Sequence, residues 1–252
     1  MKKCILLSVF LGFLSIIPCT AQFNRKAGEK NQSNRKSIIQ LGGGWHFSQT
    51  QPKGFNKVLE YYNASSASRL EGIEQMQGAS GVLGFYGNVA DGTGPSLLFE
   101  LGYRAYGAKV DASDADPALQ FNLHEFSFGM GSTFIQSAHF DWGIGLALNG
   151  SLAKTKADNL QGDATNQNFQ HFIMGASVFA PIYIGFGKEA PVALSIRPSY
   201  QYRFLESDFQ DLNRAINPDN YENLPADELK SPIHSLGVEI HLLILLRKVF
   251  YY

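Results

Sequence analysis

Cysteine is nearly absent from this sequence of 252 residues: there are two, Cys4 and Cys19, and both lie near the beginning. A chain without that first segment cannot form a disulfide, a thiolate metal site or a cysteine nucleophile. Long apolar runs are missing too, since after residue 21 no run approaches the roughly 18 residues that suggest a membrane-spanning helix. The sequence therefore excludes a helical membrane protein.

An excess of basic charge is also lacking. The chain has 21 Lys and Arg against 22 Asp and Glu, a formal charge of −1. Without Lys2 and Lys3 the balance becomes 19 − 22 = −3. Nucleic-acid binding normally requires a basic face, so we expect no nucleic-acid partner.

The segment 1–21 has the pattern of a signal peptide. Lys2 and Lys3 precede an apolar stretch over 4–17, and small residues at 19–21 supply a cleavage site. This stretch is shorter than the roughly 20 residues of a spanning helix, so we expect Gln22 to begin the mature chain. Lipid attachment at Cys19 is the alternative. The polar segment 22–36 is predicted to be a basic periplasmic tail, and 37–252 the folded domain.

From residue 37 onward, segments with a period of two residues alternate with turn-rich connections. Eight such segments are predicted, at 37–48, 79–88, 95–108, 119–134, 138–153, 169–187, 191–205 and 232–247. The connections alternate between long and short, the long ones being 49–78, 109–118, 154–168 and 206–231. This alternation is typical of an up-and-down barrel inserted from one side of a membrane.

The predicted strands have one apolar face and one face of small or polar residues. In HFDWGIGLALNGSLA (139–153), Phe140, Trp142 and Ile144 share a parity, while Asp141 and Gly143 share the other. A soluble β-sandwich also alternates. However, most of these segments run ten residues or more, as membrane-barrel strands do, and soluble strands are usually shorter. We therefore predict an all-β, eight-stranded antiparallel up-and-down transmembrane β-barrel, with the apolar face toward lipid.

Two places depart from a simple strand pattern. In 119–134 the parity of the apolar residues changes near His124-Glu125. Either Phe121 and Leu123 point inward or stand above the bilayer, or a β-bulge lies there. Pro198 interrupts a good pattern in 191–205, and proline normally marks a strand edge or bulge. The sequence alone offers no reason for its position.

The last predicted strand contains SLGVEIHL (235–242). It resembles the C-terminal assembly signal of outer-membrane barrels, with Ser235, Gly237, Ile240 and Leu242 at the signal positions. It differs in position, because ten residues follow it, ending in Phe250, Tyr251 and Tyr252. With the predicted signal peptide and eight strands, residues 37–252 resemble small bacterial outer-membrane barrels of the OmpA transmembrane-domain and OmpX type. The resemblance implies a Gram-negative cell envelope, an outer-membrane location with both termini in the periplasm, and the barrel-assembly machinery as a partner.

Parity places a set of ionisable side chains inside the barrel. They are Glu100, Arg104, Glu125, Asp141, Arg197, Arg203, Glu239 and His241. Unpaired buried charges are costly, and an eight-stranded barrel is only wide enough for its own side chains. We interpret the set as a structural charge network that fills the lumen. The alternatives are a small channel or secretion-machinery component that depends on Arg197 or Arg203, and a catalytic site.

For catalysis, the only candidate is an inward row of Ser235, Glu239 and His241. It suggests a lipid A-modifying hydrolase as the alternative to a non-enzymatic protein. We expect no catalytic residue, cofactor or metal site, and His46 is interpreted as a lumen histidine.

Helical spacing occurs in two long connections. Phe55, Val58, Leu59 and Tyr62 have it in 49–78, Phe209, Leu212 and Ile216 have it in 206–231, and a second short stretch follows around Arg69–Met76. Such helices either cap the barrel mouth or bind a partner. We predict a structural or surface-interaction protein that contacts outer-membrane lipid, lipopolysaccharide and an extracellular or envelope protein partner.

Overall fold

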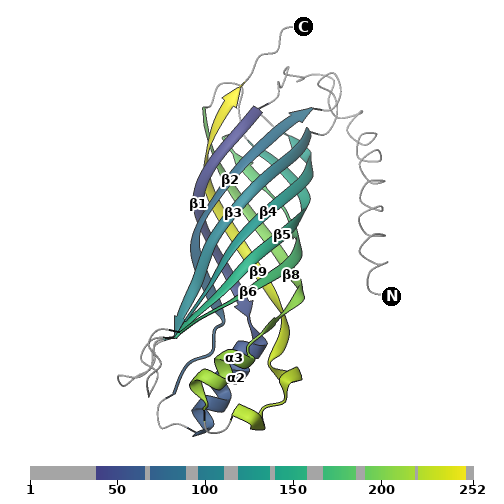
Figure 1. The fold of residues 1–252 in the computed structure, drawn as a ribbon. Coiled ribbons are helices and arrows are strands. Elements are labelled where there is room, and N and C mark those ends of the chain that lie inside the picture. The colour runs from purple at the N-terminus through teal and green to yellow at the C-terminus, as the bar shows by residue number, and fades with distance from the viewer. Residues whose placement is uncertain are drawn as a thin grey trace, which may run out of the picture.

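The computed structural model describes residues 38–65, 69–88, 96–110, 119–136, 140–157, 167–185, 191–218 and 221–247. The predicted signal peptide 1–21, the tail 22–36 and the terminal aromatics 250–252 lie outside these residues. The described chain is almost entirely β-strand, with helices gathered beyond one end of the strands (Figure 1). Neither of its α-helices is long and apolar enough to cross a membrane.

The strands close into one ring. They are β1 (Ile38–Gln51), β2 (Gln75–Asn88), β3 (Ser96–Val110), β4 (Leu119–Gln136), β5 (Phe140–Ala157), β6 (Gln167–Phe179), β7 (Ile182–Ile184), β8 (Val192–Asp208) and β9 (Lys230–Arg247). The short β7 continues β6, because both pair with β5 and β8. Neighbours pair antiparallel, and the β1–β9 and β4–β5 pairings leave no open edge. The fold is therefore an eight-stranded antiparallel up-and-down barrel, as the sequence predicts.

The ring is staggered, so its strands are tilted. Starting from Ile38 and stepping once around through paired residues leads back to β1 at Ser48, which is 48 − 38 = 10 residues further along. The path runs through Tyr86, Leu98, Gly131, Gly145, Phe179, Ser199 and Gly237. Such a stagger is required to close a sheet of eight strands into a narrow barrel filled by side chains.

Side chains alternate between lumen and exterior along every long strand. In β5, Asp141, Asn149 and Ser151 are buried, while Phe140, Trp142 and Leu148 are exposed. The exterior carries apolar side chains all around the ring, including Leu41, Leu83, Leu101, Phe128, Met174, Leu194 and Leu242. An apolar exterior around a polar interior is the arrangement of a membrane-spanning barrel.

β4 keeps one parity from Leu119 to Thr133. Phe121 and Leu123 point inward and are fully buried, while Phe126 and Phe128 are exposed. The pairing with β3 is continuous across Glu125, so the bulge considered near His124-Glu125 is wrong. The irregularity in β4 lies between Thr133 and Ile135.

Pro198 lies opposite a break in the neighbouring strand. The chain leaves β6 at Ala180, and Ala180 still donates its N–H to the carbonyl oxygen of Pro198, at 2.9 Å. The next residue, Pro181, likewise has no N–H to donate, and its carbonyl oxygen accepts a hydrogen bond from Gly143 N at 3.0 Å. Proline cannot donate to the ladder. The two prolines thus share one gap between β6 and β7, where the ladder is already interrupted.

Two helical segments cap the ring. α2 (Lys53–Ser65) follows β1, and α3 (Gln210–Ile216) follows β8, together with the 3-10 turns η2 (Tyr221–Asn223) and η3 (Ala226–Glu228). Both helices were expected from their apolar spacing. The second helical stretch expected around Arg69–Met76 is wrong, because 69–74 has no helix and β2 begins at Gln75.

Several strands extend further toward the helices than the sequence suggests. β5 runs to Ala157 and β2 starts at Gln75, although 154–168 and 49–78 were expected to be connections. The outward residues of these extensions, such as Gln77 and Lys154, are polar, so the apolar alternation ends before the strand does. Only the pairing with neighbouring strands identifies these residues as strand.

Candidate functional site

The lumen is filled in three layers. At the end where β1 begins, an apolar cluster includes Ile38, Tyr86, Phe179 and Tyr183. At the helical end, a larger apolar cluster includes Phe55 and Leu59 of α2, Phe209 just before α3, Leu212 of α3, and Phe121 of β4. The charged side chains lie between these clusters. The middle layer is therefore sealed on both sides.

α2 seals the helical end because its apolar face enters the barrel mouth. Phe55 is fully buried, with its ring centroid 5.4 Å from that of Phe121 and 5.8 Å from that of Phe209. The side chain of Asn56 holds the segment before β2 in place through two hydrogen bonds to Ile73. It accepts from Ile73 N at 2.8 Å and donates to Ile73 O at 3.0 Å. Gly54 N donates to Ser231 Oγ at 2.9 Å, which joins the helix to β9.

The middle layer is a network of three arginines and three glutamates. Arg104 bonds Glu125 on the adjacent strand and Glu239 at 2.6 Å. Arg203 bonds Glu125 at 2.8 Å, and Arg197 bonds Glu100 at 2.6 Å. All six side chains are at most 4% exposed. Equal numbers of opposite charges in contact let the barrel bury them at a tolerable cost.

Neutral groups complete the network. Glu125 accepts from Ser151 Oγ and Gln201 Nε2, both at 2.9 Å, and Glu100 accepts from Gln40 Nε2 at 3.1 Å. Arg203 also donates to Tyr106 and to Ser235 Oγ. Apart from Ser235, which belongs to the predicted inward row, these partners were missed by a search for ionisable residues alone. Their inward parity was the available signal.

The structure places seven of the eight predicted lumen residues in this layer and separates the eighth. His241 joins through Glu239, with its Nε2 3.4 Å from the carboxylate. Asp141 is fully buried elsewhere, where it accepts from the hydroxyl of Tyr86 at 3.1 Å, and Tyr86 belongs to the apolar cluster at the other end.

The row of Ser235, Glu239 and His241 points inward, but it does not form a relay. Ser235 Oγ accepts hydrogen bonds from Thr50 and Arg203. The serine that contacts His241 is instead Ser80, whose Oγ lies 2.8 Å from His241 Nε2. Glu239 approaches that same nitrogen. In a nucleophile–base–acid relay the acid would bond the other ring nitrogen. All of these side chains are buried, so this geometry does not support the hydrolase alternative.

His46 lies in the middle layer as well. It is fully buried, its ring centroid lies 4.5 Å from that of Tyr106, and neither ring nitrogen has a hydrogen-bond partner among the described residues. Within the described chain, no three His, Cys, Asp or Glu side chains are grouped as metal ligands.

The assembly-signal positions all lie on β9. Ser235 and Gly237 face the lumen, whereas Ile240 and Leu242 face outward and are 41% and 60% exposed. This is the alternation expected of a strand with one lipid-facing side.

No protein-family model and no curated protein matches the chain. Among solved structures, the chain is similar to two structures of Ail, the attachment invasion locus protein of Yersinia pestis. The identity is 10% to Ail in complex with the heparin analogue sucrose octasulfate and 8% to the second Ail structure. Both have a TM-score of 0.43 and cover 84% of this chain and all of that chain. Neisserial surface protein A (NspA) has 12% identity and a TM-score of 0.41, over 82% of this chain and 96% of that chain. Ail and NspA are small outer-membrane barrels of the OmpA/OmpX type. Similarity at this level assigns no function, and the closed strand pairing of this chain itself establishes the barrel.

Proposed function

We propose that the chain is an outer-membrane barrel that acts as a structural or surface-interaction protein through its helical end, and that it does not form a pore. The observation that carries this proposal is the sealed lumen. Three arginines and three glutamates bond one another in the middle of the barrel, and apolar clusters close both sides of them. An eight-stranded barrel filled in this way has no room for a solute.

The exterior supports the membrane location. Large apolar side chains cover the outside of the ring, among them Phe126, Phe172, Leu236 and Leu242, each at least 60% exposed. A soluble monomer rarely exposes a continuous apolar surface of this extent. Two Tyr–His pairs, Tyr103–His124 and Tyr200–His234, lie on this surface toward the helical end, each with a hydrogen bond of 3.0 Å. Aromatic residues with a polar tip are typical of the membrane–water boundary.

The lengths of the connections support a direction of insertion. Outer-membrane barrels have short periplasmic turns and longer extracellular loops. Here 52–74 and 209–229, which contain the helices, join strands at one end, while 89–95, 137–139 and 185–191 join them at the other. The helical end is therefore proposed to face outward and both termini to face the periplasm. Ser235, Gly237, Ile240 and Leu242 are proposed to be read by the barrel-assembly machinery.

The test begins with the location. The protein extracted from the outer-membrane fraction should migrate faster in SDS gels before boiling than after, because barrels often stay folded in mild SDS. A protein found in the soluble periplasm without such a shift would contradict the proposal.

Single-cysteine labelling tests the direction. Glu60 on α2 has a side chain 69% exposed, so Glu60→Cys should react with a membrane-impermeant maleimide on intact cells. Asp91→Cys, in the connection at the other end, should react only after lysis. The reverse labelling pattern would overturn the assigned direction, and a steady conductance in planar bilayers would overturn the sealed lumen.

A further inference from the structure

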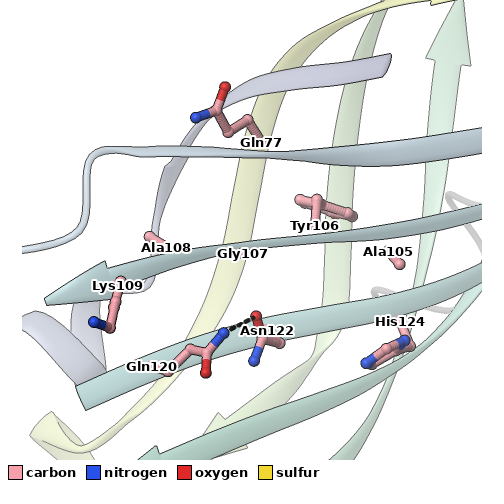
Figure 2. A pocket seen from close by; sticks show the side chains of 9 residues that line it. All are labelled: Gln77, Ala105, Tyr106, Gly107, Ala108, Lys109, Gln120, Asn122 and His124. Atoms are coloured by element: carbon pink, nitrogen blue, oxygen red, sulfur yellow. Dashed lines mark hydrogen bonds between the residues drawn. The ribbon is translucent and has the colours of Figure 1, made fainter. Parts of the chain in front are cut away.

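One histidine, His124 of β4, lies beside a hollow of about 320 Å³ on the outer wall of the barrel. Figure 2 shows this histidine together with Gln77, Gln120 and Asn122, which also line the hollow. The residue that pairs with His124 on β3 is only an alanine, Ala105, and Gly107 follows it on the same side of the strand. The histidine therefore adjoins a part of the wall where small residues leave room.

The ring of His124 is held by Tyr103. Its Nδ1 lies 3.0 Å from the Tyr103 hydroxyl, and the two ring centroids are 6.5 Å apart. Tyr103 pairs with Phe126, so it lies further from the helical end than His124 does. The hydrogen bond at Nδ1 thus turns Nε2 the opposite way, toward Asn122 and the hollow. A metal-binding histidine is usually held through its other ring nitrogen in this manner.

A bare metal ion does not suit this histidine. A zinc ion, for example, takes at least three protein ligands. Throughout the part of the chain that the structure describes, no three His, Cys, Asp or Glu side chains are grouped as metal ligands. An iron porphyrin does suit it, because the macrocycle supplies the equatorial nitrogens and the protein adds only an axial ligand such as histidine.

The surroundings of His124 match the two kinds of surface on such a ligand. Phe126 is 67% exposed and Leu152 pairs with His124, so apolar side chains adjoin the histidine. Amide side chains line the hollow on its other side. Gln120 Nε2 donates to Asn122 Oδ1 at 3.3 Å, which leaves the N–H groups of Asn122 as donors. Hydrocarbon is therefore available to the macrocycle and amide donors to its carboxylates.

We infer that this hollow binds haem, with His124 Nε2 as the axial ligand of the iron and Tyr103 as a positioning residue. His124 binds as the neutral imidazole: Nδ1–H donates to the Tyr103 hydroxyl oxygen, and Nε2 gives its electron pair to the iron. Ala105 and Gly107 leave room for the macrocycle. The inference names a ligand for the proposed surface-interaction role and rests on the proposed membrane location.

The chain contains a matched control on the far side of the ring. His234 Nδ1 lies 3.0 Å from the Tyr200 hydroxyl, and three strands separate its strand, β9, from β4 in either direction. The residue that pairs with His234 on β8 is Tyr202 and not an alanine. The two sites share the histidine and its hydrogen bond, but only His124 lines the hollow.

The experiment uses the full mature chain without a histidine tag, in a non-ionic detergent and a buffer free of imidazole. Ferric haem and iron-free protoporphyrin are titrated against the wild type, His124→Ala, His234→Ala, Tyr103→Phe and Ala105→Leu. Visible absorption and electron paramagnetic resonance distinguish imidazole-ligated iron from haem dissolved in the micelle. The heat shift in SDS gels verifies that each variant remains a folded barrel.

Ferric haem should give the imidazole-ligated spectrum in the wild type and in His234→Ala, and His124→Ala should lose it. Tyr103→Phe should lower the affinity by about tenfold or more and shift the iron spectrum, since the partner that orients the ring is gone. Ala105→Leu should weaken haem binding although His124 and Tyr103 are both present. Iron-free protoporphyrin should not distinguish the wild type from His124→Ala.

A wild type without imidazole-ligated iron would overturn the inference. Equal losses in His124→Ala and His234→Ala, or full affinity in Ala105→Leu, would do so too, because they would reduce the site to an exposed histidine. A normal heat shift in these cases would leave the proposed barrel standing. A wild type that shows no heat shift would remove the membrane location, and the haem site with it.

Discussion

The carboxylate of Glu100 and the guanidinium of Arg197 meet at 2.6 Å, although their strands, β3 and β8, lie on opposite sides of the ring. Three strands separate them in either direction. The ion pair therefore spans the lumen and fixes its width, which pairing between neighbouring strands alone does not do. Arg197 also stacks on Phe179, 3.6 Å from the ring centroid, so the charged layer rests directly on the apolar one.

Removing one partner of this pair should destabilise the barrel strongly. Glu100→Gln leaves Arg197 with a buried, incompletely compensated charge, which typically costs about 3–5 kcal/mol in the free energy of unfolding. Urea unfolding of the protein folded in lipid vesicles would measure the loss. Glu100→Leu/Arg197→Met removes both charges and should recover most of the stability. A double variant whose loss equals the sum of the two single losses would contradict a direct pairing.

Two neighbouring glycines on β1 should respond in opposite ways to a methyl group. A Cβ on Gly44 would collide with the backbone of Ile240 and His241, whereas a Cβ on Gly43 would meet no atom within 4 Å. Gly44→Ala should therefore cost about 1–3 kcal/mol or prevent assembly, and Gly43→Ala should be neutral or slightly stabilising. The heat shift and urea unfolding compare the two variants. Equal stability would mean that β1 and β9 are further apart than described.

The division into lumen and lipid faces could be predicted from the sequence, because a strand between lipid and a packed interior must alternate strictly. Parity alone places Glu100, Arg197 and Glu239 inside. It does not reveal that Arg197 bonds Glu100 while Arg104 bonds Glu239. That choice depends on the stagger of the closed ring, which is a property of all eight pairings together.

The strand ends near the helices and the position of Asp141 could not be predicted for a related reason. Beyond the lipid, outward residues such as Lys154 and Gln77 are free to be polar, so a strand there resembles a loop. Parity gives the side of the wall but not the height along the barrel, so Asp141 was grouped with the middle layer, whereas it accepts a hydrogen bond from Tyr86 of the apolar cluster at the other end.

Replacing His46 by phenylalanine should stabilise the protein. Both ring nitrogens of His46 are buried without a hydrogen-bond partner among the described residues, and each such group costs about 1–3 kcal/mol. His46→Phe keeps an aromatic ring beside Tyr106 and removes the two nitrogens. We expect a gain of about 1 kcal/mol or more in urea unfolding. Tyr106→Phe is the contrasting variant and should lose stability, because the Tyr106 hydroxyl accepts from Arg203. A destabilised His46→Phe would show that a polar group is needed at this position.

Truncating Phe55 should loosen the cap without opening the barrel wall. Its ring is fully buried against Phe121 and Phe209, and Phe→Ala at such a site costs about 3–5 kcal/mol. Glu60→Ala on the same helix is the control, since its side chain is 69% exposed and its pairing with Lys57 contributes little. Limited proteolysis should cleave near α2 faster in Phe55→Ala, while the heat shift that reports the strand ring persists. The sealed middle layer predicts that planar bilayers remain silent in this variant as well. Conductance on loss of Phe55 would show instead that the cap alone closes the lumen, and that the Arg–Glu layer beneath it lets ions pass.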